Sequence, residues 1–354
     1  MRAMSVVPIR NAGTLRQELN ARNASYATLA RLPHAVSYGE TPVVVYRQSE
    51  CGRHHGNFLS ASYHAILKRP EWRRRLQKVH SQGKHSLPKG DYVWRELDSS
   101  MSSDALLMNI FCYPGVTKRR EVSLLLGTEM GCIPQFGFMP RVPLVTNAME
   151  RTEVDMKLGD VLFEAKLTEG NFQAQDAALV EQYCDLKEVF ECRRLPRQGK
   201  HFSSYQLLRN VLAAYALNLH FCVLLDERRP DLLEQWYRVM RCIRSTTLRT
   251  KCKVLTWQEL ARCLPSGLRK FLHVKYGITE GDADCASSIA GVGFRSVHEP
   301  VAHRPNNRLM TQPSPLNLIR LRVVRAVRVR PGCQSPRWLA SASHGVKRLH
   351  SFEN

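Results

Sequence analysis

The chain has 354 residues, of which 44% are hydrophobic, and this composition predicts a globular protein with a sizeable core rather than a disordered or fibrous chain. No apolar run approaches the roughly 18 residues of a membrane helix, and the first residues lack the long apolar stretch of a secretion signal. The 52 Lys and Arg against 31 Asp and Glu give a net charge of +21, which favours a polyanionic partner such as nucleic acid and no membrane.

The eleven cysteines run from Cys51 to Cys333 without a Cys-x-x-Cys pair. This spacing favours reduced cysteines over a disulfide framework or a zinc ribbon, so we expect a soluble protein of the cytoplasm. The cluster Cys51-Gly52-Arg53-His54-His55 contains the residue types of a zinc site. No second Cys/His pair follows it at a zinc-like spacing, and we expect the cluster to be structural.

A basic segment, residues 63–80, precedes the middle of the chain and surrounds Trp72 and Leu76 with cationic side chains. Pro70 favours the start of a helix there. Three consecutive arginines of this helix are candidates for binding phosphate groups of nucleic acid: Arg73, Arg74 and Arg75. The alternative to phosphate binding, for each arginine considered alone, is that it lies on a solvent-exposed charged face of the helix.

The segment from Arg151 to Lys166 predicts a β-hairpin, because alternating residues flank a two-residue Gly159-Asp160 turn. That turn sets the register: Leu158 opposes Val161, Met156 opposes Phe163, and Asp155 opposes Glu164. One face is then wholly apolar and buried, and it consists of Val154, Met156, Leu158, Val161, Phe163 and Ala165.

The other face of the predicted hairpin places Asp155 beside Glu164, with Cβ atoms about 5 Å apart. Two carboxylates so close repel one another, and a divalent cation bound between them removes that repulsion. Oxygen ligands favour a hard ion, Mg²⁺ or Mn²⁺. Lys166 lies on the same face and is placed to stabilise negative charge on a water or phosphate beside the metal.

Asp155, eight further residues and then Glu164-Ala165-Lys166 resemble the PD-(D/E)XK core of the restriction endonuclease-like nucleases. The sequence is similar to bacterial members of that superfamily over roughly residues 39–278. Thr152-Glu153-Val154-Asp155 departs from the literal Pro-Asp of the motif, a departure that the superfamily tolerates. The resemblance implies an α/β restriction endonuclease-like core, a central mixed sheet flanked by helices, with the acidic site at one sheet edge.

The resemblance also implies two further ligands of the metal. In related proteins the carbonyl between the Glu and the Lys binds the ion, which here is that of Ala165. An acidic residue ahead of the helix similar to Ser102–Phe111 often completes the site, and Glu96 is our choice, with Asp98 and Asp104 as rivals. Restriction enzymes of this superfamily often act as homodimers, which the sequence leaves open.

Strands and helices alternate after the hairpin. Apolar spacing predicts a helix over about 171–190, on which Gln182 is a candidate for contact with nucleic acid. Ser204 is the expected cap of a helix ending at Leu217, and residues 220–225 read as a buried strand. A helix over 230–241, a strand over 253–255 and a capping box at Thr256–Glu259 complete the predicted core.

The chain divides into three predicted parts: a basic, partly helical region (1–90), the nuclease-like core (91–278) and a basic tail of low order (279–354). The last 68 residues contain eleven basic and two acidic residues, a charge of +9, which leaves +12 on the preceding chain. Apart from a short strand over 318–324, the composition of the tail predicts disorder. The tail is either an arm that contacts DNA or an incidental extension.

These observations favour a metal-dependent nuclease that hydrolyses phosphodiester bonds, most simply in DNA. Two alternatives keep the same fold. One is an inactive protein that binds nucleic acid, and the other is a nuclease that acts on RNA, because phosphate contacts alone do not distinguish the two backbones. The sequence contains no phosphate-binding Gly-rich loop, so neither a motor nor a dinucleotide enzyme is supported.

Overall fold

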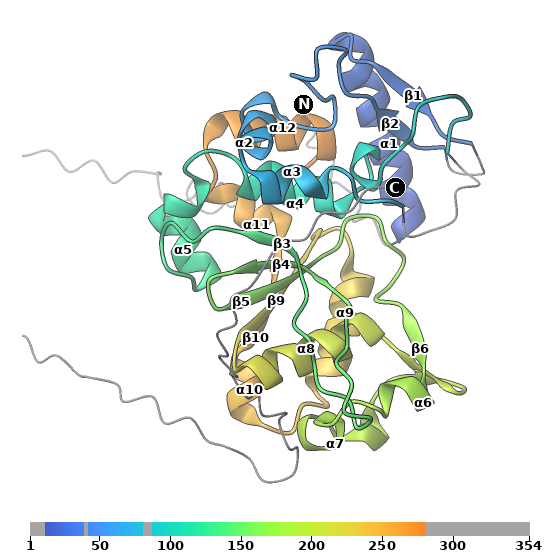
Figure 1. Ribbon diagram of the computed structural model, residues 1–354, viewed down its shortest axis with the longest axis vertical. Helices are drawn as coiled ribbons and strands as arrows, with labels where there is room; N and C mark the ends of the chain where they lie inside the picture. Colours follow the sequence, from blue (N-terminus) through green and yellow to red (C-terminus); the bar gives the residue numbers. More distant parts are fainter. Residues whose placement is uncertain (1–10, 39–41, 81–86, 280–354) are drawn as a thin grey trace, which may run out of the picture. The chain divides into compact units, whose positions relative to one another are not determined.

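The structure, a computed structural model, describes residues 11–38, 42–80 and 87–279. Its centre is a five-stranded sheet in the order β10-β9-β5-β4-β3 (Figure 1). β3, β4 and β5 are antiparallel neighbours, whereas β9 and β10 run parallel to β5. The predicted mixed sheet is therefore confirmed, and its strands are Gln135–Phe138 (β3), Val154–Leu158 (β4), Val161–Ala165 (β5), His220–Leu225 (β9) and Cys252–Thr256 (β10).

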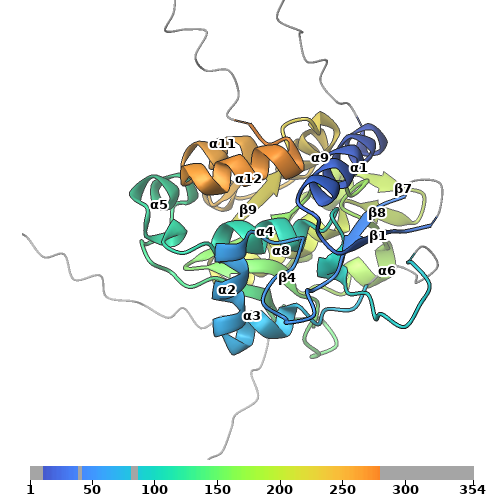
Figure 2. The same cartoon turned by 90° about the horizontal axis from the view of Figure 1, so that it is seen from above.

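Helices cover both faces of this sheet, as expected for an α/β core. On one face, Met156 and Phe163 share a hydrophobic cluster with five helices, and two of these, α1 and α12, lie side by side (Figure 2). Each fully buried Leu or Phe in such a cluster contributes about 1.5–3 kcal/mol. The five helices are Ala12–Leu29 (α1), Ser103–Phe111 (α4), Arg120–Leu126 (α5), Trp257–Arg262 (α11) and Ser266–Tyr276 (α12).

The opposite face of the sheet packs Leu162, Phe221 and Val223 into a second cluster. In Figure 1, α8, α9 and α10 lie on this side of the sheet. The helices that supply buried residues to this second cluster are Ala177–Val180 (α6), Leu186–Val189 (α7), Tyr205–Leu217 (α8), Pro230–Met240 (α9) and Thr246–Thr250 (α10).

The remaining elements are short. A two-stranded antiparallel sheet (β1, β2) follows α1, and a three-stranded sheet in the order β6-β8-β7 precedes α8. The predicted helix start at Pro70 is confirmed, because Pro70 occupies the first turn of α3. The bounds are His34–Val36 (β1), Val44–Tyr46 (β2), Ser60–Lys68 (α2), Pro70–Arg75 (α3), Glu96–Asp98 (η2), Val116–Lys118 (η3), Ala174–Asp176 (β6), Cys192–Arg194 (η4), Arg197–Gln198 (β7) and His201–Ser203 (β8).

The hairpin β4–β5 has the predicted register at its turn. Met156 pairs with Phe163 and Leu158 with Val161, and Gly159 has the positive φ of 55° that the turn requires. Five of the six residues predicted for one apolar face belong to the first hydrophobic cluster. Val154 is the exception, since it packs in the second cluster together with Leu162. Helices on both faces bury the whole of β5.

The helix predicted over 171–190 is wrong. The segment instead contains β6, α6 and α7, because its backbone groups bond to other parts of the chain. The carbonyls of Phe172 and Gln173 accept hydrogen bonds from the first N–H groups of α8, and β6 pairs with β8. Of the six residues expected on one apolar face, Val180, Tyr183, Leu186, Val189 and Phe190 are buried, but Leu179 is 51% exposed.

The later elements agree more closely with their predictions. The strand at 220–225 is β9, and the capping box is formed, with Thr256 Oγ1 accepting from the Glu259 N–H at 3.0 Å. Ser204 stands at the N-cap position of α8, but its side chain does not cap the helix. The division of the chain into three parts stays a prediction, and the tail from residue 280, with the strand predicted at 318–324, lies outside the described residues.

A lysine is buried where α12 meets α1. Lys275 is fully buried among the rings of Tyr26, Tyr46 and Tyr276, and burial lowers its pKa well below the usual value. A lysine whose pKa is lowered in the fold binds a proton more weakly there than in the unfolded chain, which costs stability at every pH below about 10.4. We expect Lys275→Met to raise the melting temperature at pH 7, and the gain to shrink as the pH approaches 10. The exposed Lys270→Met on α12 is the control, and an equal gain there would contradict the explanation.

Within the described ranges, no helix is both long enough and apolar enough to span a membrane.

Candidate active site

Asp155 and Glu164 meet at the end of the β4–β5 hairpin that is remote from its turn. The backbone N–H of Ala165 donates to Asp155 Oδ2 at 2.7 Å, which ties the Asp155 side chain to the strand that carries Glu164. Glu164 is 1% exposed and Asp155 is partly buried. Desolvation first, and then the charges of Glu164 and Asp104, raise the pKa of Asp155 well above its usual value. The two predicted carboxylates are therefore neighbours that repel one another.

Asn210 of α8 positions the Glu164 carboxylate. Its Nδ2 donates to Glu164 Oε2 at 2.7 Å, and its own Oδ1 accepts from Arg209 Nε at 3.2 Å. Arg209 in turn donates to the Glu153 carbonyl at the start of the hairpin. The hydrogen bond from Arg209 to Asn210 Oδ1 orients the Asn210 amide so that its Nδ2 faces Glu164. Arg209 and Asn210 together therefore hold the Glu164 carboxylate in place. Sequence reasoning missed Asn210, because no local pattern connects α8 with β5.

Lys166 supplies the cation of the site. Its Nζ lies 2.8 Å from Glu164 Oε1, and the residue is 5% exposed. Burial disfavours the charged amine, but the charges of Glu164, Glu169 and Asp155 outweigh it and raise the pKa of Lys166. Lys166 is therefore protonated at neutral pH. In this state it is a source of positive charge and not a general base.

The Lys166 backbone is fixed by two long-range hydrogen bonds. Its N–H donates to the Leu224 carbonyl of β9 at 2.8 Å, and its carbonyl accepts from Trp257 Nε1 of α11 at 2.9 Å. The sheet and α11 thus hold the chain in place just beyond the last residue of β5. This rigidity allows the short Glu164-Ala165-Lys166 run to present two side chains toward Asp155.

A second layer of charges borders Asp155. Asp104 of α4 is 4% exposed and lies 2.8 Å from Arg75 Nη2 and 2.7 Å from Lys78 Nζ. Arg75 also binds Glu153, at 2.8 Å. At Gly137 of β3, a Cβ would lie 2.3 Å from Arg75 Nη1, so this glycine leaves the space that the Arg75 side chain occupies. Asp104 interacts with Asp155 electrostatically and is itself neutralised by two cations.

The three acids considered for the remaining place in the metal site lie in different surroundings. Glu96 lies 2.8 Å from Lys78 Nζ, so a cation separates it from Asp104. Asp98 points elsewhere, and its Oδ1 lies 2.9 Å from His55 Nε2. Only Asp104 is among the groups that shift the pKa of Asp155. Glu96 as a metal ligand stays a prediction.

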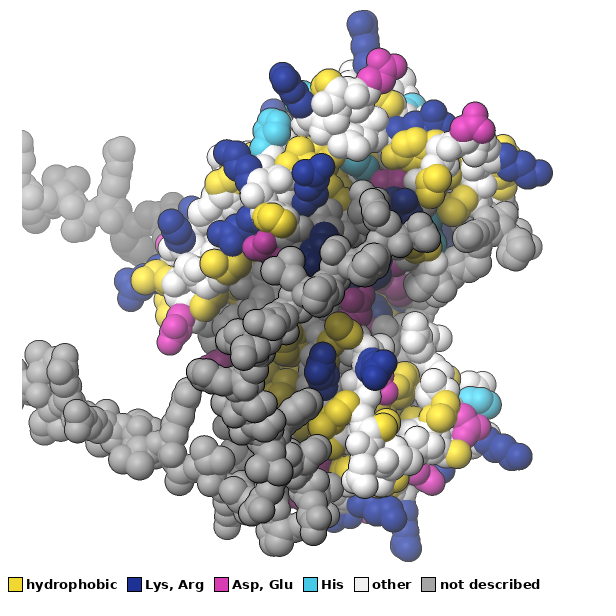
Figure 3. Space-filling view, viewed as in Figure 1, with side chains coloured by type: hydrophobic (Ala, Val, Ile, Leu, Met, Phe, Trp, Pro, Cys, Tyr) yellow, Lys and Arg dark blue, Asp and Glu magenta, His cyan; other side chains and the backbone are white. Residues whose placement is uncertain are grey.

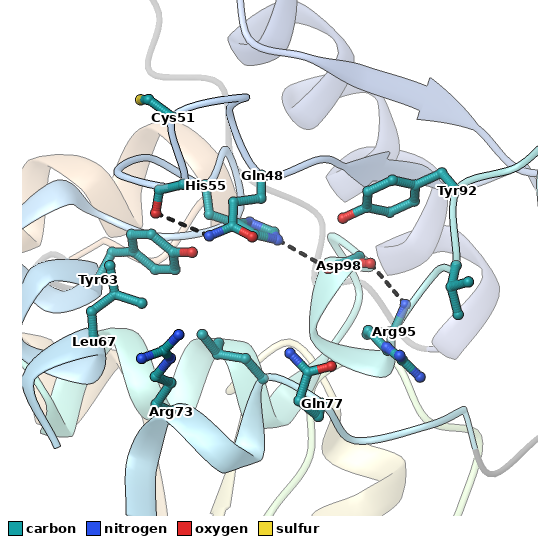
Figure 4. A pocket seen from close by; sticks show the side chains of 13 residues that line it. Gln48, Cys51, His55, Tyr63, Leu67, Arg73, Gln77, Tyr92, Arg95 and Asp98 are labelled. Atoms are coloured by element: carbon teal, nitrogen blue, oxygen red, sulfur yellow. Dashed lines mark hydrogen bonds and ion pairs between the residues drawn. The ribbon is translucent and has the colours of Figure 1, made fainter. Parts of the chain in front are cut away.

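The Cys51–His55 cluster borders a separate pocket, which is drawn in Figure 4. His55 Nδ1 accepts from the Asn57 N–H at 3.1 Å, so the ring proton is on Nε2 and is donated to Asp98. Both side chains are buried. The pair supports the loop, while Cys51 is exposed. Among the described residues no zinc-like set of ligands forms there, and a structural role for the cluster stays a prediction.

The predicted contacts with nucleic acid are dispersed. Arg75 is engaged with Asp104 and Glu153, whereas Arg73 and Arg74 are exposed on α3, and Arg73 lines the pocket of Figure 4. Gln182 is not on a helix. It follows α6, and its carbonyl accepts from the Val145 N–H at 2.8 Å. The roles of these four residues in binding nucleic acid stay predictions.

An arginine-lined pocket of about 590 Å³ was not foreseen. No acidic side chain lines it, and its cations come from η4, β7 and the end of α9: Arg194, Arg197, Arg238 and Arg241. Arg197 and Arg238 also form exposed ion pairs with Glu181 and Glu234. A neighbouring pocket shares Arg194 and Arg241 and adds Arg244 and Arg249. These residues are scattered in sequence, so no run of basic residues predicts the pocket. Figure 3 shows Lys and Arg on both the upper and lower parts of one face.

The donor set at the hairpin is compatible with a hard divalent cation. Glu164 Oε1 is buried and has no hydrogen bond, only the ion pair with Lys166, and within the described chain Asp155 Oδ1 has no hydrogen-bond partner. The Lys166 ammonium thus lies beside Glu164 Oε1, where a positive charge compensates the buried carboxylate. No group of three or more His, Cys, Asp or Glu among the described residues is arranged to hold a metal. Mg²⁺ is suited to two carboxylates, because it retains several waters.

A comparison with protein-family models gives one match. The model described as Restriction Endonuclease associating with ARP covers residues 26–277, well over half of the chain, and that span includes both α3 and the whole five-stranded sheet. Comparisons with curated proteins and with solved structures gave no match.

Proposed function

The chain belongs to the family of restriction endonucleases associating with ARP, and is by family a nuclease; from this premise we propose that it hydrolyses phosphodiester bonds of DNA with a divalent metal ion, at Asp155, Glu164 and Lys166. The observation that carries the proposal is the ion pair of Lys166 with a buried Glu164, beside an Asp155 that the Ala165 N–H holds in place. Two repelling carboxylates with one cation are costly to bury, and a catalytic site accounts for that cost.

Asp155 and Glu164, with the carbonyl of Ala165, would hold Mg²⁺ or Mn²⁺. Such an ion activates water for attack and neutralises charge on the phosphate. Asn210 and the Ala165 N–H each occupy one oxygen of a carboxylate, so the ion would bind Asp155 Oδ1 and Glu164 Oε1, in the place that Lys166 Nζ holds beside Oε1 in this structure. Asp104 would stay outside the metal site and hold Arg75 and Lys78 beside it.

Lys166 would stabilise the negative charge that develops on the phosphate during attack. Since its pKa is raised, it retains its proton at neutral pH and does not remove one from water. The pH dependence of cleavage therefore should not report deprotonation of this lysine. The proton of the attacking water would pass to solvent or to a phosphate oxygen of the substrate.

Substrate phosphates would be bound by the arginine-lined pocket. We expect the double variant Arg194→Gln, Arg241→Gln to weaken DNA binding and to reduce the slope of log affinity against log salt concentration by about 2, because two phosphate contacts are lost. The measurement is fluorescence anisotropy with a labelled duplex over a salt series. The double variant Arg120→Gln, Lys270→Gln removes the same charge from exposed positions of α5 and α12. Equal slopes for the two double variants would contradict the assignment.

The test of the activity itself is a cleavage assay. Purified protein is incubated with plasmid, linear duplex, single-stranded DNA and RNA, each with Mg²⁺, Mn²⁺ or EDTA. We expect metal-dependent cutting of DNA that EDTA abolishes. Cleavage that persists in EDTA contradicts the metal site, cutting confined to RNA contradicts the substrate, and the absence of any cutting contradicts the enzyme.

A further inference from the structure

The pocket of Figure 4 is distinct from the acidic site and has a volume of about 580 Å³. We propose that it binds a nucleoside monophosphate unit, with the base against the ring of Tyr92 and the phosphate on arginine. Its volume falls within the range of about 300–1,000 Å³ for ligand pockets. Binding of a nucleotide in this pocket does not require that the protein cleaves DNA. Only the proposal that the nucleotide belongs to a DNA strand rests on the proposed function.

Two aromatic rings face the pocket from different parts of the chain (Figure 4). Tyr63 of α2 is 1% exposed and stacks on Phe58, with ring centres 5.7 Å apart, so it forms part of the wall and offers no free ring face. Tyr92 is only partly buried, with its ring 4.6 Å from that of Trp94. A ring held in this way presents a fixed π surface, and such surfaces bind bases by stacking without regard to their sequence.

Polar groups of the pocket suit the edge of a base. Gln77 of the segment after α3 is exposed, and its amide has no hydrogen bond within the described chain. Gln48 uses Nε2 for the Gly52 carbonyl at 2.9 Å, which leaves its Oε1 as an acceptor. A glutamine side chain offers a donor and an acceptor together, the combination that recognises base edges.

The charge of the pocket favours an anion. Arg73 and Arg95 line it, and neither guanidinium forms an ion pair with a described residue. Asp98 is the one acid among the lining residues, and its two oxygens are occupied by His55 Nε2 and by the Arg95 N–H. The lining therefore carries two available cations, and guanidinium groups bind phosphate through paired N–H donors.

Two elements connect this pocket with the acidic site. Helix α3 carries Arg73 to the pocket and Arg75 to Asp104, and η2 carries Asp98 to the pocket and Glu96 to Lys78. A base taken out of the DNA stack could therefore be held by elements that also contact the charges around Asp155. Enzymes that act on or inspect a base extrude it in this manner.

The test measures binding and not cleavage. Isothermal titration calorimetry with the four deoxynucleoside 5′-monophosphates is carried out on the full chain, on Arg73→Gln and on Arg120→Gln. We expect Arg73→Gln to lower the affinity at least about ten-fold, the effect of losing a charged hydrogen bond. Arg120→Gln, a change at an exposed position of α5 outside the pocket lining, should leave the affinity unchanged. Gln77→Ala, also at an exposed position, should lower it as well.

A second arm separates a free nucleotide from an extruded one. A duplex with a single 2-aminopurine is titrated with the Asp155→Asn variant, and emission rises if the base leaves the stack. A rise that Arg73→Gln and Gln77→Ala suppress assigns the pocket to the strand, and nucleotide binding without a rise assigns it to free nucleotide. If neither probe binds, or if Arg73→Gln and Gln77→Ala bind as the wild type and Arg120→Gln do, the proposal is overturned. Both arms give a result even if the chain cuts nothing.

Discussion

Replacing Asp155 by asparagine is expected to reduce cleavage by at least about a thousand-fold and, in the same protein without metal, to raise the melting temperature. The loss follows because one of the two proposed metal-binding carboxylates is gone. The gain follows because the Asp155 charge is desolvated and faces Glu164 and Asp104, which raises its pKa. An asparagine of the same size can still accept from the Ala165 N–H without carrying that charge.

The sign of the pH effect follows from the raised pKa. Between about 3.8, the value in the unfolded chain, and the higher value in the fold, the folded state binds more protons than the unfolded state. The contribution of Asp155 to stability is therefore present at low pH and is lost as the pH rises through the folded pKa. In EDTA, the difference in melting temperature between Asp155→Asn and the wild type should be largest at neutral pH and disappear below about pH 3.8.

The control for this variant is Asp160→Asn, which changes an exposed aspartate in the turn of the same hairpin. It should leave both cleavage and melting temperature unchanged. Added Mg²⁺ should raise the melting temperature of the wild type and of Asp160→Asn, since a ligand that binds only the folded state stabilises it, and should leave Asp155→Asn unaffected. An Asp155→Asn protein that cuts DNA normally would falsify the assignment of this carboxylate.

The hairpin could be predicted because its information is local. The Gly159-Asp160 turn determines the register as far as Met156 and Phe163, and Asp155 and Glu164 come directly after this last pair. The neighbours of these carboxylates could not be predicted in this way. Asn210 reaches Glu164 from α8, and Arg75 reaches Asp104 from α3, through contacts between distant segments. No period or spacing records such contacts in a single sequence.

The two clearest departures have the same cause. Apolar spacing over 171–190 found the buried residues but not the backbone, because Phe172 and Gln173 accept hydrogen bonds from α8 and do not continue a helix. The sequence offered Glu96, with Asp98 and Asp104 as rivals, only because the resemblance implies an acid near the start of the helix ahead of the hairpin. In the fold, Lys78 lies between Glu96 and Asp104, and His55 holds Asp98 at another pocket. Tertiary contacts therefore determine both the backbone conformation of 171–190 and the surroundings of the three acids.

Replacing Lys166 by methionine is expected to abolish cleavage and to destabilise the fold by about 3–5 kcal/mol, the usual cost of removing one partner of a buried ion pair. Glu164 is 1% exposed and its Oε1 has no other partner in the described chain, so the variant leaves a desolvated charge uncompensated. Adding Glu164→Gln to Lys166→Met removes that charge. The double variant should therefore recover most of the stability and none of the activity.

Urea denaturation of the wild type, both single variants and the double variant gives the coupling free energy between residues 164 and 166 directly. Lys157→Met on the same hairpin is the matched control, because Lys157 is partly exposed beside the Phe138 ring and forms no ion pair with a described residue. It should change neither the free energy of unfolding by more than about 0.5 kcal/mol nor the cleavage rate. Additive effects at 164 and 166 would show that the pair is not coupled in solution. The cation of the proposed site would then have to come from elsewhere, and Arg75 of α3, whose charge interacts with that of Asp155, is an alternative.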